Sequence, residues 1–137
     1  MTPKQVADYM LGQDYFSQWM NIKMIEVKEN YCLIEMPIKK EMINGLKTVH
    51  GGVTFAFADS ALAFSSNNSG DAAVALNCVI NFTKAGNEGD IFKAESILVN
   101  NTRKTAIYDI KITNQNEELI AKFVGTVYKI GKKVIEL

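Results

Sequence analysis

The clearest hydrophobic pattern in the chain is the alternation of apolar and polar positions over residues 104–113. Because successive side chains of a strand point to opposite faces, this alternation predicts a strand with one buried face in an antiparallel sheet. The residues expected on the buried face are Ala106, Tyr108, Ile110 and Ile112. Other runs have strand-like composition. They span about residues 24–28, 31–38, 72–83, 91–101 and 118–130.

Residues 51–66 are the one strongly helical segment, and they are apolar on almost every side. A helix that is apolar all round is buried, so we expect this one to lie against the concave face of the sheet. The run Asn67-Asn68-Ser69-Gly70 closes it with residues that favour turns. The first 20 residues place Phe16, Trp19 and other apolar residues among polar ones, which indicates one or two short helices.

The predicted order of elements is short helices, two strands, one long helix and four strands. This order is typical of an α+β fold with an antiparallel sheet. No linker, repeat or break in composition divides the sequence, so we expect residues 1–137 to form a single domain. The hydrophobic fraction of 47% and the charged fraction of 22% are those of a soluble globular protein.

The charge balance and residue types limit the classes of function. Lysine and arginine number 15, as do aspartate and glutamate, so no basic excess favours binding to nucleic acid. The single histidine, His50, and the cysteines, Cys32 and Cys78, lack the spacing of a metal site, and we expect no metal and no disulfide. No apolar stretch approaches the roughly 20 residues of a membrane span. We therefore expect a cytoplasmic protein without a membrane partner.

Asp59 is the one charged residue of the helical segment, and no lysine or arginine lies between Lys47 and Lys84 to pair with it locally. A carboxylate is rarely buried without a partner, because its desolvation costs several kcal/mol. One interpretation places Asp59 at a solvent-exposed edge or against a polar neighbour across a subunit boundary. The other makes it a functional carboxylate.

The helix begins with His50-Gly51-Gly52, which allows a sharp entry and a close approach of a ligand to the backbone. The first N–H groups of a helix lack internal partners, so they can bind a developing oxyanion. Tight packing at the helix start is the alternative explanation of the glycines. Gly51 and Asp59 are eight residues apart, which is roughly 12 Å along a helix and too far for both to touch one carbonyl. A two-fold dimer with antiparallel helices would bring Asp59 of each chain to Gly51 of its partner.

Several stretches of the chain match a known family pattern. They are Asn44-Gly45, His50-Gly51-Gly52, Phe55-Ala56-Phe57-Ala58-Asp59-Ser60-Ala61, Ala72-Ala73-Val74-Ala75, Ile80-Asn81-Phe82, Gly89-Asp90 and Tyr108-Asp109-Ile110. With these residues, from about residue 20 to its end, the chain resembles the hotdog-fold thioesterases. The resemblance is closest to the branch linked to phenylacetate degradation, the PaaI-like thioesterases. It implies a hotdog fold, with the sheet wrapped around the helix.

The resemblance also implies a role for each matching residue. Asp59 would be the general base that activates water, or the nucleophile that forms a transient anhydride. The backbone N–H of Gly51 would polarise the thioester carbonyl, and Asn44 would hydrogen-bond in the same pocket, facing Asp59 of the partner subunit. His50 would support the loop rather than transfer protons. CoA would be part of the substrate, and no cofactor is needed.

Further positions are expected near the substrate. Gly52 allows close approach. Some relatives orient the attacking water with a serine on the first strand after the helix; the matching stretch here lacks one, and Asn77 or Ser60 would substitute. Lys84, Arg103 and Lys104 are candidates for contacts with the CoA phosphates, although each is equally explained as a solvated turn charge. The expected acyl-pocket residues are Phe57, Leu62, Phe64 and Phe82.

The expected activity is hydrolysis of an acyl-CoA carrying an aryl-acetyl or other medium-size acyl group, by a homodimer that pairs again into a tetramer (a dimer of dimers). Two alternatives stay open. One is a non-catalytic acyl-CoA binding module. The other is a hotdog hydratase or dehydratase, although such enzymes typically pair a catalytic histidine with an acid on the helix.

Overall fold

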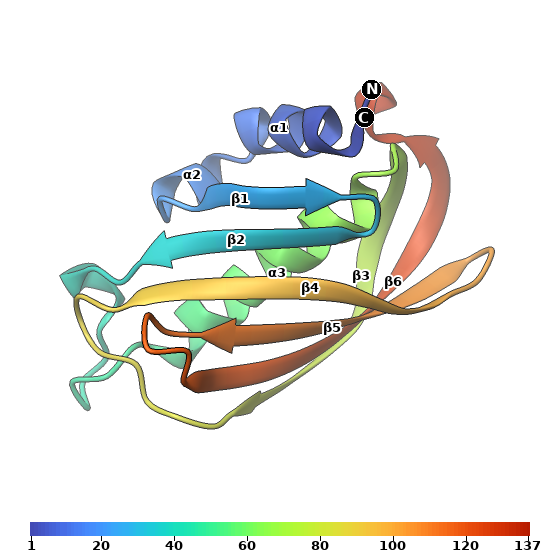
Figure 1. Ribbon diagram of the computed structural model, residues 1–137. Helices are drawn as coiled ribbons and strands as arrows, with labels where there is room; N and C mark the ends of the chain where they lie inside the picture. The colour runs from blue at the N-terminus through green and yellow to red at the C-terminus, as the bar shows by residue number, and fades with distance from the viewer.

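The computed structural model describes residues 1–137 as one six-stranded antiparallel sheet that curves around a long helix (Figure 1). The strands lie in the order β1-β2-β4-β5-β6-β3, and every neighbouring pair is antiparallel. The α+β fold with an antiparallel sheet is therefore confirmed. The strands are β1 (Lys23–Lys28), β2 (Tyr31–Pro37), β3 (Asp71–Phe82), β4 (Ile91–Asn101), β5 (Thr105–Thr113) and β6 (Leu119–Lys133).

Helix α3 (Gly51–Asn67) lies against the concave face of the sheet, and α1 (Pro3–Gln13) and α2 (Tyr15–Trp19) lie beside β1 (Figure 1). The expected helix and the two short N-terminal helices are all present. The sequence did not indicate two short 3-10 helices, η1 (Lys40–Met42) and η2 (Val134–Glu136). No helix is both long enough and apolar enough to cross a membrane.

The core lies between α3 and the inner face of the sheet. The alternation along β5 is confirmed, because each residue of its expected inner face is buried. Phe57, Leu62 and Phe64 of α3 are also buried, and they pack in this core. The expectation that these three side chains line an acyl pocket is therefore wrong: they face the sheet. Phe82, at the end of β3, remains exposed.

Hydrogen bonds fasten the carboxyl end of α3 to the turn between β1 and β2. The Asn68 side chain is buried; its amide nitrogen donates to the carbonyls of Lys28 and Tyr31 at 2.8 and 3.1 Å. Its oxygen accepts from the backbone N–H of Asn30 at 2.9 Å. Buried backbone groups need such partners. The helix is thus held in a fixed place along the sheet, which also fixes its other end.

Replacing Asn68 with alanine leaves three backbone groups without their partner. We expect Asn68→Ala to lower the free energy of unfolding by about 2–4 kcal/mol. Ser69→Ala is the matched control, since Ser69 is exposed in the same turn, and its change should stay within about 0.5 kcal/mol. Equal losses in the two variants, measured by urea denaturation, would contradict this role of Asn68.

Candidate active site

One backbone amide at the start of α3 has no hydrogen-bond acceptor within the chain. The His50 imidazole caps the helix, and its Nδ1 accepts from the N–H of Gly52 at 2.9 Å. The N–H groups of Val53 and Thr54 donate to the His50 carbonyl at 2.9 and 3.3 Å. The N–H of Gly51 makes no hydrogen bond with any other group of the chain. It is therefore the one amide of this first turn that is free to bind an oxyanion.

The surroundings of Gly51 explain why this position lacks a side chain. A Cβ on Gly51 would lie 3.3 Å from Cζ of Phe82, and one on Gly52 would lie 3.0 Å from Nδ1 of His50. The N–H of Val49 donates to the carbonyl of Gly86 at 2.9 Å, which ties the helix entry to the loop after β3. The packing explanation of the glycines is therefore supported, while the binding of an oxyanion by the Gly51 N–H stays a prediction.

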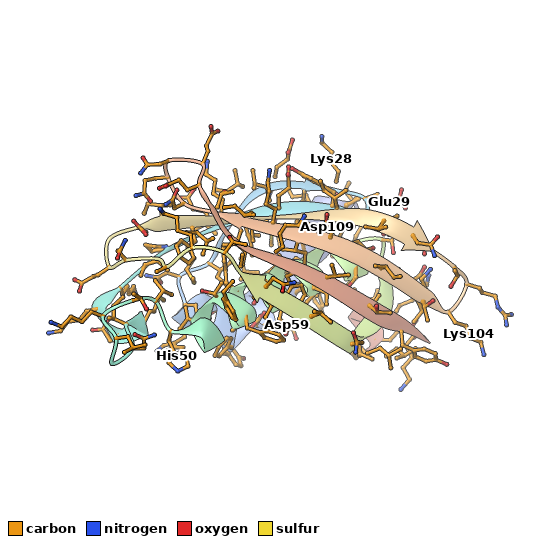
Figure 2. The ribbon with its side chains drawn as sticks, turned by 90° about the horizontal axis from the view of Figure 1, so that it is seen from below. Lys28, Glu29, His50, Asp59, Lys104 and Asp109 are labelled. Atoms are coloured by element: carbon orange, nitrogen blue, oxygen red, sulfur yellow. The ribbon has the colours of Figure 1, made fainter.

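Asp59 lies in the middle of α3, beside β3 (Figure 2). Its side chain is exposed in the single chain and forms no ion pair. Desolvation by neighbouring groups raises the pKa of Asp59, and the negative charge of Asp14 raises it further. Burial and the charge of Asp59 together raise the pKa of the Cys78 thiol in β3. Asp59 is thus a helix carboxylate whose negative charge has no cationic partner within the chain, and it lies beside the edge strand β3.

Ser60 points to the N-terminal helices, and its hydroxyl is engaged there. Its Oγ lies 2.9 Å from Oγ of Ser17, which donates to the carboxylate of Asp14 at 2.6 Å. Asp14 also caps α2 by accepting from the N–H of Ser17 at 2.9 Å. Ser60 therefore joins α3 to α2 within the chain. Asp14 and Ser17 were not predicted as structural residues, although an aspartate just before a short apolar segment is an N-cap signal.

Asn77 does not take the place of the missing serine within the chain. A bulge between Ala75 and Asn77 changes the register of β3 against β6. Cys78 lies opposite Gly125, where an added Cβ would meet Leu62 of α3, so Cys78 faces the helix. Asn77, one position earlier, is exposed and points to the other face of the sheet. Its side chain and Asp59 of the same chain therefore cannot share a water.

Asn44 organises the loop before α3. Its Oδ1 accepts from the backbone N–H groups of Leu46 and Thr48 at 2.9 and 3.2 Å, and from the Thr48 hydroxyl at 3.3 Å. Its amide nitrogen makes no hydrogen bond within the chain, so this group is left to donate elsewhere. The turn expected at Asn44-Gly45 is confirmed by the bond from the N–H of Asn44 to the Thr48 carbonyl at 2.8 Å.

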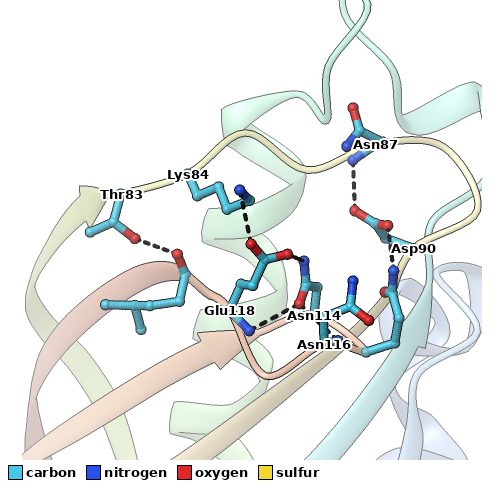
Figure 3. Close-up of polar contacts among 9 residues, drawn as sticks. Thr83, Lys84, Asn87, Asp90, Asn114, Asn116 and Glu118 are labelled. Atoms are coloured by element: carbon cyan, nitrogen blue, oxygen red, sulfur yellow. Dashed lines mark hydrogen bonds and ion pairs between the residues drawn. The ribbon is translucent and has the colours of Figure 1, made fainter.

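Of the three basic candidates, Lys84 lies nearest the free amide. Lys84 and Gly51 line the same pocket of about 390 Å³. The Lys84 ammonium pairs with the Glu118 carboxylate at 3.0 Å (Figure 3), and a hydrogen bond from Asn114, together with Lys84, lowers the pKa of Glu118. Arg103 and Lys104 lie in the turn between β4 and β5. Figure 2 shows Lys104 on the opposite side of the folded molecule from His50. They line a groove with Lys129 and Lys132.

An antiparallel sheet curved around a central helix, with a free amide at the helix start, is the hotdog arrangement of thioesterases. The chain matches the family model of the thioesterase superfamily over residues 46–121. It therefore belongs to the thioesterase superfamily. The hotdog fold and the resemblance to PaaI-like thioesterases are confirmed.

Individual relatives agree with this assignment. The chain is 38% identical to a putative esterase of Archaeoglobus fulgidus, covering 94% of this chain and 84% of the relative. It is 35% identical to the acyl-coenzyme A thioesterase PaaI of Escherichia coli, covering 93% and 91% of the two chains. The solved structure of E. coli PaaI, from the phenylacetic acid degradation operon, superposes with a TM-score of 0.94 at 34% identity, over 96% of this chain and 95% of that one. A Streptococcus mutans protein bound to acetyl CoA superposes with a TM-score of 0.79 at 28% identity, over 82% and 90%.

The capping bond predicts that His50 acts through the helix start rather than by proton transfer. His50→Ala should lower the free energy of unfolding by about 1 kcal/mol, and His50→Asn should restore it, because asparagine is a good N-cap. Thioester hydrolysis by His50→Asn should stay within several-fold of the wild-type rate. A loss of 100-fold or more in His50→Asn, with the stability restored, would instead indicate acid–base catalysis.

Proposed function

We propose that the protein hydrolyses acyl-CoA thioesters at two equivalent sites, each shared between the two chains of a dimer. The observation that carries this proposal is the pairing of one free amide, Gly51 N–H, with one uncompensated carboxylate, Asp59, on the same helix. Their separation of roughly 12 Å along α3 prevents both from acting on one carbonyl within a chain. The E. coli relative named as an acyl-coenzyme A thioesterase supports CoA as the carrier.

The edge strand β3 supports a dimer. It pairs only with β6, so its other side presents unpaired backbone groups. A long apolar edge is a template for pairing with another chain. The apolar side chains exposed along β3 are Val74 (51%), Leu76 (63%), Val79 (54%) and Phe82 (56%). A second copy, pairing antiparallel through β3, would cover this edge and make the sheet continuous across the two chains.

The same two-fold pairing would complete the site. Antiparallel β3 strands place the Asp71 end of one strand beside the Phe82 end of the other. Since Gly51 lies against the Phe82 ring, the start of α3 in one chain would lie close to the interface with the partner. The two antiparallel α3 helices would then place Asp59 of each chain beside Gly51 of the partner subunit. Covering this carboxylate with the partner subunit would raise its pKa further by desolvation.

The reaction would begin with the thioester carbonyl bound by the N–H of Gly51, which stabilises the charge that develops on oxygen. Asp59 of the partner subunit would then take a proton from an attacking water, or attack the carbonyl itself and form an anhydride that water cleaves. Either route breaks the carbon–sulfur bond, and CoA leaves as the thiolate. The amide of Asn44 would donate a second hydrogen bond in this pocket. His50 would hold the helix start, and Gly52 would leave room for the substrate.

The CoA phosphates would meet basic groups from both chains. Arg103 and Lys104 share a groove with Asp71. In the proposed dimer, the end of β3 at Asp71 would lie beside Gly51 of the partner subunit. Arg103 and Lys104 would therefore contribute to the partner's site, although they lie far from His50 of their own chain. Lys84 would act from the same chain as Gly51, at the cost of its ion pair with Glu118.

Several expectations stay predictions. They are the single domain over residues 1–137, the absence of a cofactor, the cytoplasmic location and the pairing of dimers into a tetramer. Among the other functions, the binding-module alternative predicts acyl-CoA binding without thiol release. The hydratase alternative needs His50 to transfer protons, whereas its Nδ1 is engaged in the helix cap.

The proposed function is tested by thiol release from a panel of aryl-acetyl, aroyl, short and long acyl-CoAs. Asp59→Asn should lower the rate by at least 100-fold, because it removes the base or nucleophile, while gel filtration shows the dimer intact. The same variant should be more stable to heat, since it removes a desolvated charge. Release that persists in Asp59→Asn would refute the role of Asp59, and binding without any release would favour the binding module.

Two substitutions of Gly51 separate the effect of losing its N–H from the effect of adding a side chain. Gly51→Pro removes the N–H, and proline is tolerated at the first position of a helix. The preceding His50 already has ψ 131°, which suits a residue before proline. Gly51→Ala adds a Cβ near Phe82 but keeps the N–H, so it is the matched control. We expect kcat to fall about 100- to 1,000-fold more in Gly51→Pro than in Gly51→Ala, and equal losses would contradict the oxyanion role.

The pH dependence should respond to Asp14. Hydrolysis needs ionised Asp59, so the rate falls as the pH drops through the pKa of Asp59, which is raised above its ordinary value. Asp14→Asn removes the negative charge that contributes to this rise while keeping a capping side chain. The acid limb of the kcat profile should therefore move to lower pH. Asp8→Asn, in the exposed pair with Lys4, is the control and should leave the profile unchanged.

A further inference from the structure

A cavity of about 620 Å³ lies between α2, η1 and the start of α3. Its volume falls in the range of small-molecule pockets. The walls are mostly apolar, and the charged side chains Lys39 and Glu41 also line it. The apolar lining residues are Phe16, Trp19, Met20, Met42, Val53 and Ala56.

This cavity adjoins the free amide. His50 and Gly52 line the apolar cavity, whereas Gly51 lines the pocket that contains Lys84. The residue that carries the free N–H therefore lies between an apolar space and a space with a basic group. A thioester has the same division, with an apolar acyl group on one side of the carbonyl and a polar, phosphate-bearing carrier on the other.

The wall formed by α2 is held in place by hydrogen bonds to α3 within the chain. The bond between Ser17 and Ser60 fastens α2 to α3 one residue after Asp59, and Asp14 fixes Ser17. Phe16 and Trp19 pack against each other with ring centroids 5.9 Å apart and planes inclined by 48°. Even so, they are 51% and 73% exposed. Neighbouring exposed aromatic rings form an apolar surface that is available to a ligand.

We propose that this cavity is the acyl subsite, and that Phe16 and Trp19 of α2 determine which acyl groups the enzyme accepts. The inference rests on the proposed function, because it takes the thioester carbonyl to lie at Gly51. The occupant is an uncharged apolar acyl group, aromatic or of medium chain length, that packs on the two rings. A small acyl group such as acetyl would be too short to contact Phe16 and Trp19.

Trp19 is the only tryptophan of the chain, so intrinsic fluorescence reports on this wall alone. The Asp59→Asn variant is titrated with phenylacetyl-CoA, octanoyl-CoA, acetyl-CoA and free CoA, and binding is followed in parallel by calorimetry. We expect the two larger thioesters to shift or quench the emission with the Kd found by calorimetry. Acetyl-CoA and CoA should bind without this change. Equal responses to all four, or binding of the larger thioesters with no response, would overturn the assignment.

Substitutions then test specificity in the active enzyme. Trp19→Ala and Phe16→Ala should each lower kcat/KM for the larger thioesters by at least tenfold relative to acetyl-CoA, mainly through KM. Tyr15→Ala is the matched control on α2: Tyr15 is more exposed than either ring and does not line the cavity, so its selectivity should stay that of the wild type. Equal losses for every thioester would show a structural role for the two rings and overturn the proposal.

The outcomes also separate this inference from the proposed function. If the wild-type protein cleaves acyl-CoAs but its acyl preference ignores Phe16 and Trp19, only the acyl subsite is refuted. If Trp19 responds to the larger thioesters while no thioester is cleaved, hydrolysis is refuted and the apolar subsite stands. If no acyl-CoA binds at all, both fail.

Discussion

A single rigid helix imposes the constraint on which the rest of this structure depends. The free amide of Gly51 and the carboxylate of Asp59 lie on one α-helix, eight residues apart, and a helix can neither bend nor stretch to bring them to one atom. In the proposed mechanism, the two groups would act on one carbonyl only across two helices that run in opposite directions. The unpaired apolar edge of β3, which lies beside Asp59, offers the surface for that arrangement.

The two ends of α3 are held by hydrogen bonds, whereas its middle carries a partly desolvated carboxylate. Its carboxyl end is fastened by Asn68, and its amino end by the cap from His50 and by the loop around Gly86. Its middle carries Asp59, whose pKa is raised by desolvation and by the negative charge of Asp14. A carboxylate that destabilises the fold persists only where the surrounding structure tolerates it, and such positions gather at functional sites. The two fastened ends of the helix fix the position of Asp59.

Local patterns predicted the elements, but not the contacts that depend on register. The alternation along β5 and the apolar run of α3 each specify one element, so both were predictable. The face of Asn77 was not: one extra residue in the bulge after Ala75 reverses every later side chain of the strand, and no pattern in β3 marks it. The wall formed by Phe16 and Trp19 was also missed. Apolar residues spaced along a short helix predict a face packed in the core equally well as a cavity wall.

The most direct test of a shared site mixes two inactive proteins. Gly51→Pro lacks the amide and Asp59→Asn lacks the carboxylate, so neither homodimer has a complete site. After unfolding and refolding together in equal amounts, half of the dimers would contain both chains, and each of these would have one site with both groups intact. A shared site would restore about a quarter of the wild-type rate of thiol release. A mixture no more active than the separate variants, with mixed dimers shown to be present, would contradict it.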